Sequence, residues 1–219
     1  MELVSYDLPW KPALVMPVGD IQWFGDDHEI ALEKLQKHIA WGVERGAWFI
    51  GMGDAIDAFS PSNRQRLKAA AMYDNANRVI DGAARALVQE LYEQVLKPST
   101  GHWLGLLAGH HYADLQDGTA TAQLLAGMLK TRHLGDCAYV NLRFADGHRS
   151  GTVLIWTHHG QGSGKSVAAP IQKLEALPSS WEGDIFLMGH QSKVAAAPLD
   201  RCEPVWDKAA CAPDSVKPP

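Results

Sequence analysis

Five apolar segments of the chain each end in a glycine beside a carboxylate or an imidazole. These endings are Gly19-Asp20, Gly53-Asp54, Gly109-His110-His111, His158-His159-Gly160 and Gly189-His190. Carboxylate oxygens and imidazole nitrogens are common protein ligands of divalent metal ions. Glycine lets the backbone turn sharply and approach a ligand closely. One such ending is typical of an ordinary turn, but five of them predict a shared metal site.

The segments that must position these residues have the composition of buried strands. Apolar strand patterns lie within residues 13–20, 47–54, 102–111, 138–160 and 183–191, and the fourth reads as two strands around an Asp146-Gly147 turn. Helical spacing of apolar residues covers 26–46, 64–96, 120–129 and 167–177, and Asp26 or Asp27 is positioned to cap the first helix. The first half alternates strand and helix, whereas the second half is richer in antiparallel strands. In open α/β sheets, ligand sites lie beyond the carboxyl ends of the strands, where these motifs fall.

The bulk composition is that of a single folded domain. The chain has 219 residues, of which 46% are hydrophobic, and no linker or repeat divides it. We therefore predict one α/β domain over residues 1–200, followed by a proline-containing tail over 201–219. Three cysteines without C-x-x-C spacing argue against a disulfide framework. With no signal peptide or membrane-length apolar run, the sequence predicts a soluble, cytoplasmic protein.

The motifs resemble those of the calcineurin-like metallophosphoesterases, in particular phage-encoded members. That family carries D-x-H, G-D-x-x-D, G-N-H followed by an acid, a later H-G, and G-H-x-H. The corresponding residues here are Asp20-x-Gln22, Gly53-Asp54-x-x-Asp57, Gly109-His110-His111, His159-Gly160 and Gly189-His190-Gln191-Ser192. The resemblance spans residues 17–192. It implies a four-layer fold of two packed mixed β-sheets flanked by helices, and hydrolysis of phosphate esters with two divalent ions.

The resemblance also implies a role for each matching residue. Asp54 would bridge two ions, which lie roughly 3.5–4 Å apart in two-metal sites and activate the attacking water. Asp20 would bind the first ion, and His159 and His190 the second. His111 would stand near the leaving group without binding metal, where it can protonate the departing oxygen or stabilise the phosphoryl charge.

Four positions depart from the family pattern. Gln22 and Ser192 replace two histidines that serve the first ion, His110 replaces an asparagine that serves the second, and Tyr112 replaces an acid. The first site then offers oxygen donors from Asp20, Gln22 and Asp54, with Ser192 holding a metal-bound water or Gln191 taking its place. The second site has one carboxylate and three imidazoles, from Asp54, His110, His159 and His190.

The two donor sets favour different ions. Imidazole suits zinc and iron, whereas carboxylate and carbonyl oxygens suit manganese and magnesium. We therefore expect one or two divalent ions (Mn, Zn, Fe or Mg), with the second site filled more readily than the first.

Some neighbouring residues admit two interpretations. His158 is an alternative to His159 as a ligand, although the residue directly before the glycine matches the family motif. Asp57 is expected to support its loop rather than bind metal. Asn63, Arg64 and Arg66 either meet a substrate phosphate or begin a solvated helix.

A nucleotide-binding P-loop is a competing explanation of the segment Gly160–Ser166. The Gly164-Lys165-Ser166 ending fits the pattern G-x-x-x-x-G-K-[ST], but that pattern requires a glycine at position 159, which is His159. The P-loop is therefore disfavoured.

The sequence predicts a metal-dependent hydrolase of phosphate esters, and of phosphodiesters in nucleotides or nucleic acid in particular. The alternative is a catalytically weakened protein of the same fold that serves as a metal-binding scaffold or partner-binding module. A formal charge of −5, from 20 basic and 25 acidic residues, argues against nonspecific DNA binding and favours a small substrate. No membrane partner is expected, and the oligomeric state is left open.

Overall fold

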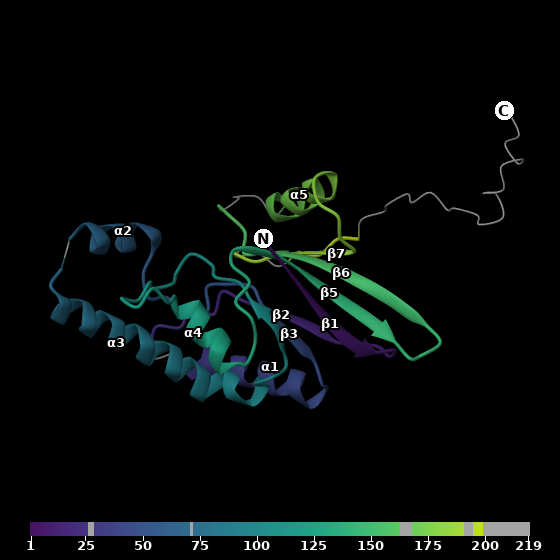
Figure 1. Cartoon of the computed structure of the whole chain (residues 1–219), viewed down its shortest axis with the longest axis horizontal. Helices are drawn as coiled ribbons and strands as arrows, with labels where there is room; N and C mark the ends of the chain where they lie inside the picture. Colours follow the sequence, from purple (N-terminus) through teal and green to yellow (C-terminus); the bar gives the residue numbers. More distant parts are fainter. Residues whose placement is uncertain (26–28, 71, 163–167, 191–194, 199–219) are drawn as a thin grey trace, which may run out of the picture.

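The protein has a mixed α/β fold with two β-sheets and five α-helices in the part of the chain that the structure describes (Figure 1). This computed structural model describes residues 1–25, 29–70, 72–162, 168–190 and 195–198. One sheet has the strand order β2-β3-β4 and the other the order β1-β5-β6-β7. The predicted tail, residues 201–219, lies outside the described residues.

The three-stranded sheet consists of parallel strands from the first half of the chain. They are β2 (Val15–Val18), β3 (Trp48–Gly51) and β4 (Trp103–Leu106), and β3 pairs with both neighbours. All three strands are confirmed as predicted. Because they are parallel, the loops that follow them emerge at the same edge of the sheet.

The four-stranded sheet combines the N-terminal segment with the second half of the chain. Strand β1 (Glu2–Pro9) pairs in parallel with β5 (Cys137–Ala145), and β6 (Ser150–His158) pairs in parallel with β7 (Ile185–Met188). Between β5 and β6 the pairing is antiparallel. Their connection is the predicted hairpin turn, in which Asp146 Oδ1 accepts backbone hydrogen bonds from His148 and Arg149.

Two predictions about this sheet need correction. The sequence pattern did not reveal β1, and β5–β6 is the only antiparallel strand pair among the described residues. The expectation of a second half rich in antiparallel strands therefore holds for that hairpin alone. The sequences of β5 and β6 do not show that β1 and β7 run parallel to them, because these two neighbours come from other parts of the chain.

Helices cover the outer faces of both sheets. The helices α1 (Glu29–Glu44), α3 (Asp74–Leu91) and α4 (Thr121–Met128) pack on the three-stranded sheet, and α5 (Ala169–Ala176) lies over the four-stranded one (Figure 1). The short helix α2 (Pro61–Ala69) lies near the beginning of α3. Two single-turn segments, Lys97–Ser99 and Leu177–Ser179, are 3-10 helices. No described helix has the length and apolar character needed to cross a membrane.

The predicted helical region 64–96 is divided into separate elements. α2 ends at Ala69, α3 begins at Asp74, and the end of α3 widens into a π-helical turn over Tyr92–Leu96. Tyr73 has an extended backbone, and the side-chain amide of Asn77 donates a 3.1 Å hydrogen bond to the carbonyl of Met72. This local contact stabilises a break that helical periodicity alone does not indicate.

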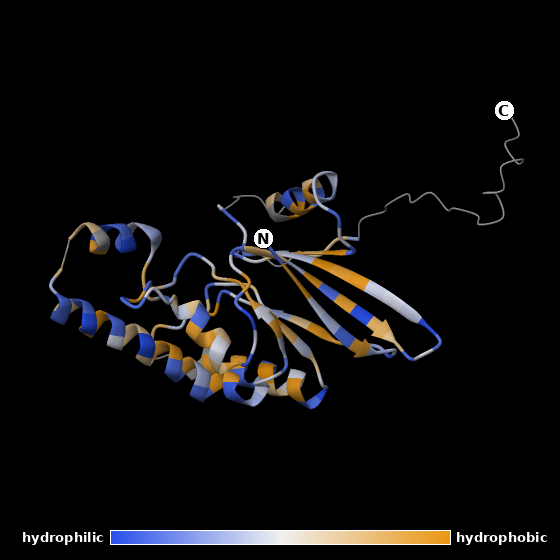
Figure 2. Ribbon diagram, viewed as in Figure 1, coloured by the Kyte–Doolittle hydropathy of each residue, from blue (hydrophilic) through white to orange (hydrophobic). Residues whose placement is uncertain are grey.

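The three-stranded sheet contributes to two hydrophobic cores because alternate side chains point to opposite faces. Phe49 and Trp103 face the helices and stack with ring centroids 5.2 Å apart. Ile50 and Leu104 face the other sheet and pack with residues such as Val140. Figure 2 shows that α3 is mainly hydrophilic near α2 and more hydrophobic toward its C-terminal end.

The core between the sheets should dominate stability. Leu104→Ala removes a fully buried side chain between the two sheets, and we expect it to lower the free energy of unfolding by about 2–5 kcal/mol. Leu3→Ala, an exposed leucine on β1, should change it by less than about 0.5 kcal/mol. Urea unfolding followed by circular dichroism measures both, and equal losses in the two variants would contradict the assigned packing.

Candidate metal centre

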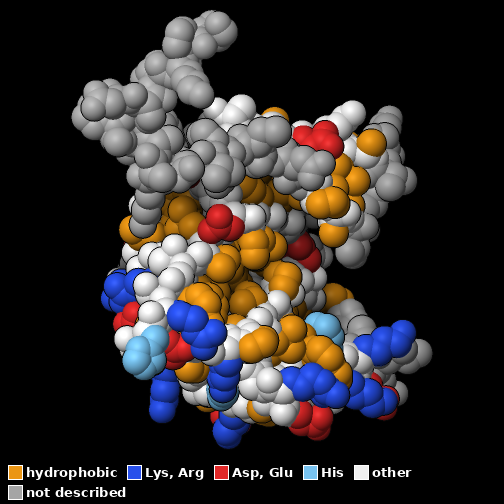
Figure 3. Space-filling model, turned by 90° about the vertical axis from the view of Figure 1, so that its right-hand side faces the viewer, with side chains coloured by type: hydrophobic (Ala, Val, Ile, Leu, Met, Phe, Trp, Pro, Cys, Tyr) orange, Lys and Arg blue, Asp and Glu red, His pale blue; other side chains and the backbone are white. Residues whose placement is uncertain are grey.

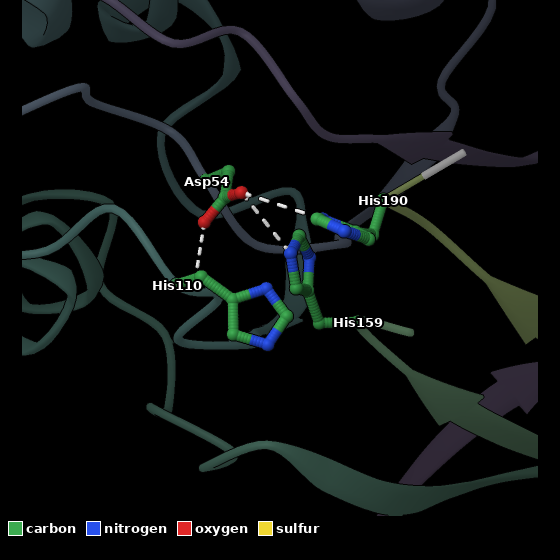
Figure 4. A group of neighbouring side chains, drawn as sticks. All are labelled: Asp54, His110, His159 and His190. Atoms are coloured by element: carbon green, nitrogen blue, oxygen red, sulfur yellow. Dashed lines mark hydrogen bonds and ion pairs between the residues drawn. The ribbon is translucent and has the colours of Figure 1, made fainter. Parts of the chain in front are cut away.

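Four potential metal ligands from four separate strand ends meet at one point of the molecule (Figure 4). Asp54 follows β3, His110 follows β4, His159 follows β6 and His190 follows β7. One ligand atom from each residue lies within 4.8 Å of the corresponding atoms of the others. We refer to these four residues as the Asp/His cluster.

Unusual backbone conformations bring these side chains together. Asp20, Gln22, Asp54 and His190 all have positive φ angles, between 49° and 60°. Such conformations cost non-glycine residues on the order of 1–3 kcal/mol each and tend to gather at functional sites. A Cβ atom at Gly109 would collide with the backbone nitrogen and carboxylate of Asp54. The glycine is therefore required for the close approach of the two loops.

Asp54 is the central residue of the cluster and is only 1% exposed. Its Oδ1 atom accepts hydrogen bonds from the backbone N–H groups of His110 and His111, the latter at 2.9 Å. Burial alone would raise the pKa of Asp54, but the His159 imidazole and these two N–H groups lower the pKa to about 2. The carboxylate is therefore ionised at neutral pH, with Oδ2 directed toward the imidazoles.

His159 is 2% exposed and has a defined orientation. Its Nδ1 lies 2.7 Å from the carbonyl oxygen of Met52 and donates to it, which leaves the Nε2 lone pair facing Asp54. His159 Nε2 is 3.1 Å from Asp54 Oδ2. Both atoms are buried and have no hydrogen bond of normal geometry.

These two buried atoms supply a test of whether a metal ion fits. Buried polar atoms are almost always paired, and an ion held between the carboxylate and the imidazole would satisfy both. Fixing the opposite imidazole nitrogen with a backbone carbonyl is also the usual arrangement for a metal-binding histidine. The residues present therefore suit a divalent ion.

His110 and His190 complete a ring of three imidazoles. Their ring centroids are 4.8 Å apart and lie 4.6 and 5.1 Å from that of His159, and His190 Nδ1 lies 4.0 Å from Asp54 Oδ2. Burial and the neighbouring His159 lower the pKa of His110, which favours the neutral, ligating form. Three imidazoles and one carboxylate suit zinc, iron and similar ions.

The residues expected to form the other metal site lie beside the cluster. Asp20 Oδ2 accepts a 2.9 Å hydrogen bond from the backbone N–H of His190, and the backbone N–H of Gln22 donates to the carbonyl of Asp54 at 2.9 Å. Both side chains are exposed. Ser192 and Gln191 lie outside the described residues. The structure therefore brings together the donors expected for the second site and places Asp20 and Gln22 at its border.

His111 forms a pair with Asp57 next to the cluster. His111 Nδ1 lies 2.7 Å from Asp57 Oδ1, and the His111 backbone is tied to Asp54. The sequence assigned Asp57 only a supporting role in its own loop. The three-residue spacing from Asp54 was the available signal, but it does not reveal which imidazole Asp57 meets.

His158 and His159 point to opposite faces of the four-stranded sheet. His158 Nδ1 accepts a 2.7 Å hydrogen bond from the backbone N–H of Gly160, and its ring stacks on Trp156 with centroids 5.6 Å apart. The structure thus places His159 in the Asp/His cluster and His158 away from it.

Arg64 holds the loop that carries His110 and His111. Its Nη1 lies 2.8 Å from the carbonyl oxygen of Phe59, 2.5 Å from that of His110 and 3.0 Å from that of Tyr112. Its guanidinium carbon lies 3.9 Å from the centroid of the Tyr112 ring. Asn63 is exposed at the beginning of α2. Of the three candidate phosphate contacts, Arg64 is thus engaged with the protein backbone, whereas Asn63 and Arg66 are exposed.

Comparisons with known proteins do not add to this description of the site. The chain matches no protein-family model, no curated protein and no solved structure. The assignment of the site consequently depends on the residues themselves.

The Asp/His cluster should be the tightest site for a divalent ion on the chain. We expect calorimetry with Zn²⁺ or Co²⁺ to show one tight site per chain, which His190→Ala weakens at least about 100-fold and exposed His148→Ala leaves unchanged. Burial lowers the pKa of His159, but Asp54, the Met52 carbonyl and Asp20 raise it above the ordinary value. Because a metal ion must displace that proton, affinity should fall by about tenfold per pH unit as the pH drops below this pKa.

Two equally tight zinc ions would contradict the inequality of the sites. An affinity that rises as the pH falls would contradict the ligand assignment of His159.

Arg64 should act on metal binding rather than on substrate binding alone. Arg64→Lys removes the guanidinium that lies over the Tyr112 ring and whose Nη1 contacts three carbonyls. We therefore expect a loss of about 1–3 kcal/mol in stability and roughly tenfold weaker metal binding. Arg66→Lys, at an exposed arginine on the same helix, is the matched control for stability and metal affinity. A raised KM with unchanged metal affinity and unchanged urea midpoint would instead indicate a direct contact with substrate phosphate.

Proposed function

We propose that this protein is a metal-dependent hydrolase of phosphate esters, phosphodiesters in particular, of the calcineurin-like metallophosphoesterase type. The observation that carries the proposal is the Asp/His cluster beside the His111–Asp57 pair. The cluster offers metal ligands, and the pair offers a group that can transfer a proton. Their coincidence at converging strand ends is difficult to explain by folding stability alone, because it collects strained backbone and buried polar atoms.

The cluster residues would hold the ion and fix its position. Asp54 presents Oδ2 because Oδ1 is occupied by two backbone N–H groups, and His159 presents Nε2 because Nδ1 is occupied by the Met52 carbonyl. When bound, a divalent ion at such a site supplies Lewis-acid stabilisation of phosphoryl oxygens and a nucleophile derived from water. Asp20 and Gln22 lie where they could support a second ion.

His111 would manage the proton of the leaving group. Asp57 accepts from Nδ1, so the other ring nitrogen, Nε2, is the atom available to donate a proton to the departing oxygen. The Asp57 carboxylate would orient the ring. The backbone bond from His111 to Asp54 sets the distance between the proton donor and the metal ligands.

The charge around the site favours diesters over monoesters. Arg64, a cation that lies beside the cluster in the described part of the chain, is engaged with three backbone carbonyls and a tyrosine ring. A dianionic phosphomonoester needs more positive charge for binding than a monoanionic phosphodiester does. The fold is compatible with the family's four layers, since helices flank both packed sheets.

Hydrolysis assays with added manganese test the proposal. We expect turnover of bis-p-nitrophenyl phosphate to exceed that of p-nitrophenyl phosphate, and Asp54→Ala to abolish both activity and tight metal binding. His111→Ala should retain the metal but lose about 10²–10⁴-fold in kcat for an alkyl ester, whose leaving group needs a proton. The loss should be much smaller for a p-nitrophenyl ester, because p-nitrophenolate departs without a proton.

The control for this assay is His148→Ala, which lies in the β5–β6 turn and should keep full activity. Activity that survives Asp54→Ala would refute the site assignment. If the protein binds metal but hydrolyses neither ester with any of the four expected metals, the metal-binding scaffold is favoured instead.

A further inference from the structure

A large groove lies between the outer face of the four-stranded sheet and α5. Its volume is about 820 Å³, and its walls include Trp156 and His158 from β6, Trp181 after α5, and Met188 from β7. Figure 1 shows α5 above the ends of β6 and β7 that carry the cluster residues. The groove is in the size range of small-molecule sites and is mostly apolar, as such sites are.

Aromatic rings form one wall of the groove. Trp156 is the buried centre of this wall, and its ring centroid lies 5.6 Å from that of His158 and 6.0 Å from that of Trp181. The His158 ring is nearly parallel to Trp156, with an interplanar angle of 20°. Trp181 is 38% exposed, so part of its ring is available for a ligand to stack on. This wall suits a flat aromatic ring.

Two hydrogen-bond donors give the groove a polar preference. Trp156 Nε1 is a buried donor without a hydrogen-bond partner among the described residues, although buried indole N–H groups usually have one. His158 Nδ1 accepts from Gly160, so in the neutral ring Nε2 carries the hydrogen. A flat ligand with acceptor atoms on its edge would match these donors better than a hydrocarbon would.

The groove and the Asp/His cluster share a wall at Gly160. A Cβ atom built there would lie 3.0 Å from Met188 Cγ, which faces the groove, and 3.3 Å from the Cβ of the cluster residue His190. His158, the last residue of β6, and His159, which follows it, likewise point to opposite faces of the four-stranded sheet. A single residue of the shared wall therefore separates a molecule held in the groove from the Asp/His cluster.

We propose that the groove binds the nucleobase of a phosphate ester, with Trp181 and His158 contacting the ring and the phosphate directed toward the Asp/His cluster. This proposal rests on the proposed hydrolase function for its phosphate, whereas the base site stands on the groove itself. A nucleobase combines the flat ring that the aromatic wall suits with the edge acceptors that the two donors require. Lys173 Nζ binds the carbonyl of Gln161 and thereby connects α5 to the loop after His159.

Binding can be measured separately from hydrolysis. The first experiment is calorimetry of thymidine 5′-monophosphate and deoxyribose 5-phosphate with metal-free wild-type protein. Only the compound with the base should bind. Trp181→Ala should weaken its binding about tenfold, as expected for the loss of one stacking contact.

Trp10→Ala is the matched control, since Trp10 is also 38% exposed. It follows β1 beside the β5–β6 turn, where its backbone N–H binds the carbonyl of Ala145. Figure 3 views the side of the molecule that carries this turn, where hydrophobic side chains lie among lysines and arginines. There Trp10 packs near Gly151 and under Arg149. Ala176→Phe, on the exposed face of α5 that lines the groove, fills the groove without removing any existing contact. It should abolish binding even if Trp181→Ala fails to fold.

A second experiment uses the metal-loaded protein and two esters with the same leaving group. They are the p-nitrophenyl ester of thymidine 5′-monophosphate and methyl p-nitrophenyl phosphate. If the substrate supplies the base, Trp181→Ala raises KM about tenfold for the thymidine ester alone. If KM is unchanged but calorimetric binding weakens, the groove holds a nucleobase from a separate ligand.

The outcomes separate the two proposals. Equal binding of both phosphates, or binding that neither Trp181→Ala nor Ala176→Phe changes, overturns the base site whatever the enzyme hydrolyses. Binding that depends on Trp181, in a protein that hydrolyses no ester, overturns the proposed function and leaves the base site standing.

Discussion

The carboxylate of Asp54 connects the parts of this structure on which the candidate site depends. One oxygen is held by the backbone N–H groups of His110 and His111, which joins the loop after β3 to the loop after β4. The other oxygen faces His159 and His190, which follow β6 and β7 of the second sheet. A single buried side chain thus bridges both sheets at their carboxyl edges. Its low pKa keeps it charged at neutral pH.

The stability of the two packed sheets makes this arrangement possible. Positive φ angles at Asp20, Gln22, Asp54 and His190, together with the buried polar atoms of the cluster, oppose folding. The apolar layer between the sheets, with residues such as Ile50, Leu104 and Val140, opposes that cost. The site is accordingly located on short loops attached directly to rigid strands, where small displacements of the ligands are resisted.

The alternation of side chains along β6 gives this end of the molecule two distinct chemical environments. His159 turns toward Asp54 and Met52, whereas His158 stacks on Trp156 and faces the groove beneath α5. Adjacent residues can therefore contribute to a charged site and to an aromatic wall without sharing a face. Gly160 allows the two regions to approach closely, because any side chain there would meet Met188 and His190.

The sequence by itself determined the buried strands and the chemistry at their ends, because apolar runs that stop at Gly-Asp or Gly-His are local patterns. β1 was not recognised, since its pairing with β5 joins residues 136 positions apart, as in Glu2 with Ala138. The break between α2 and α3 likewise depends on contacts that periodicity does not encode. Only the tertiary structure decided that Asp57 contacts His111, that Arg64 binds backbone carbonyls, and that His158 lies outside the cluster. These outcomes depend on the direction of a side chain in space, which is set by sheet packing and loop geometry rather than by residue type and spacing.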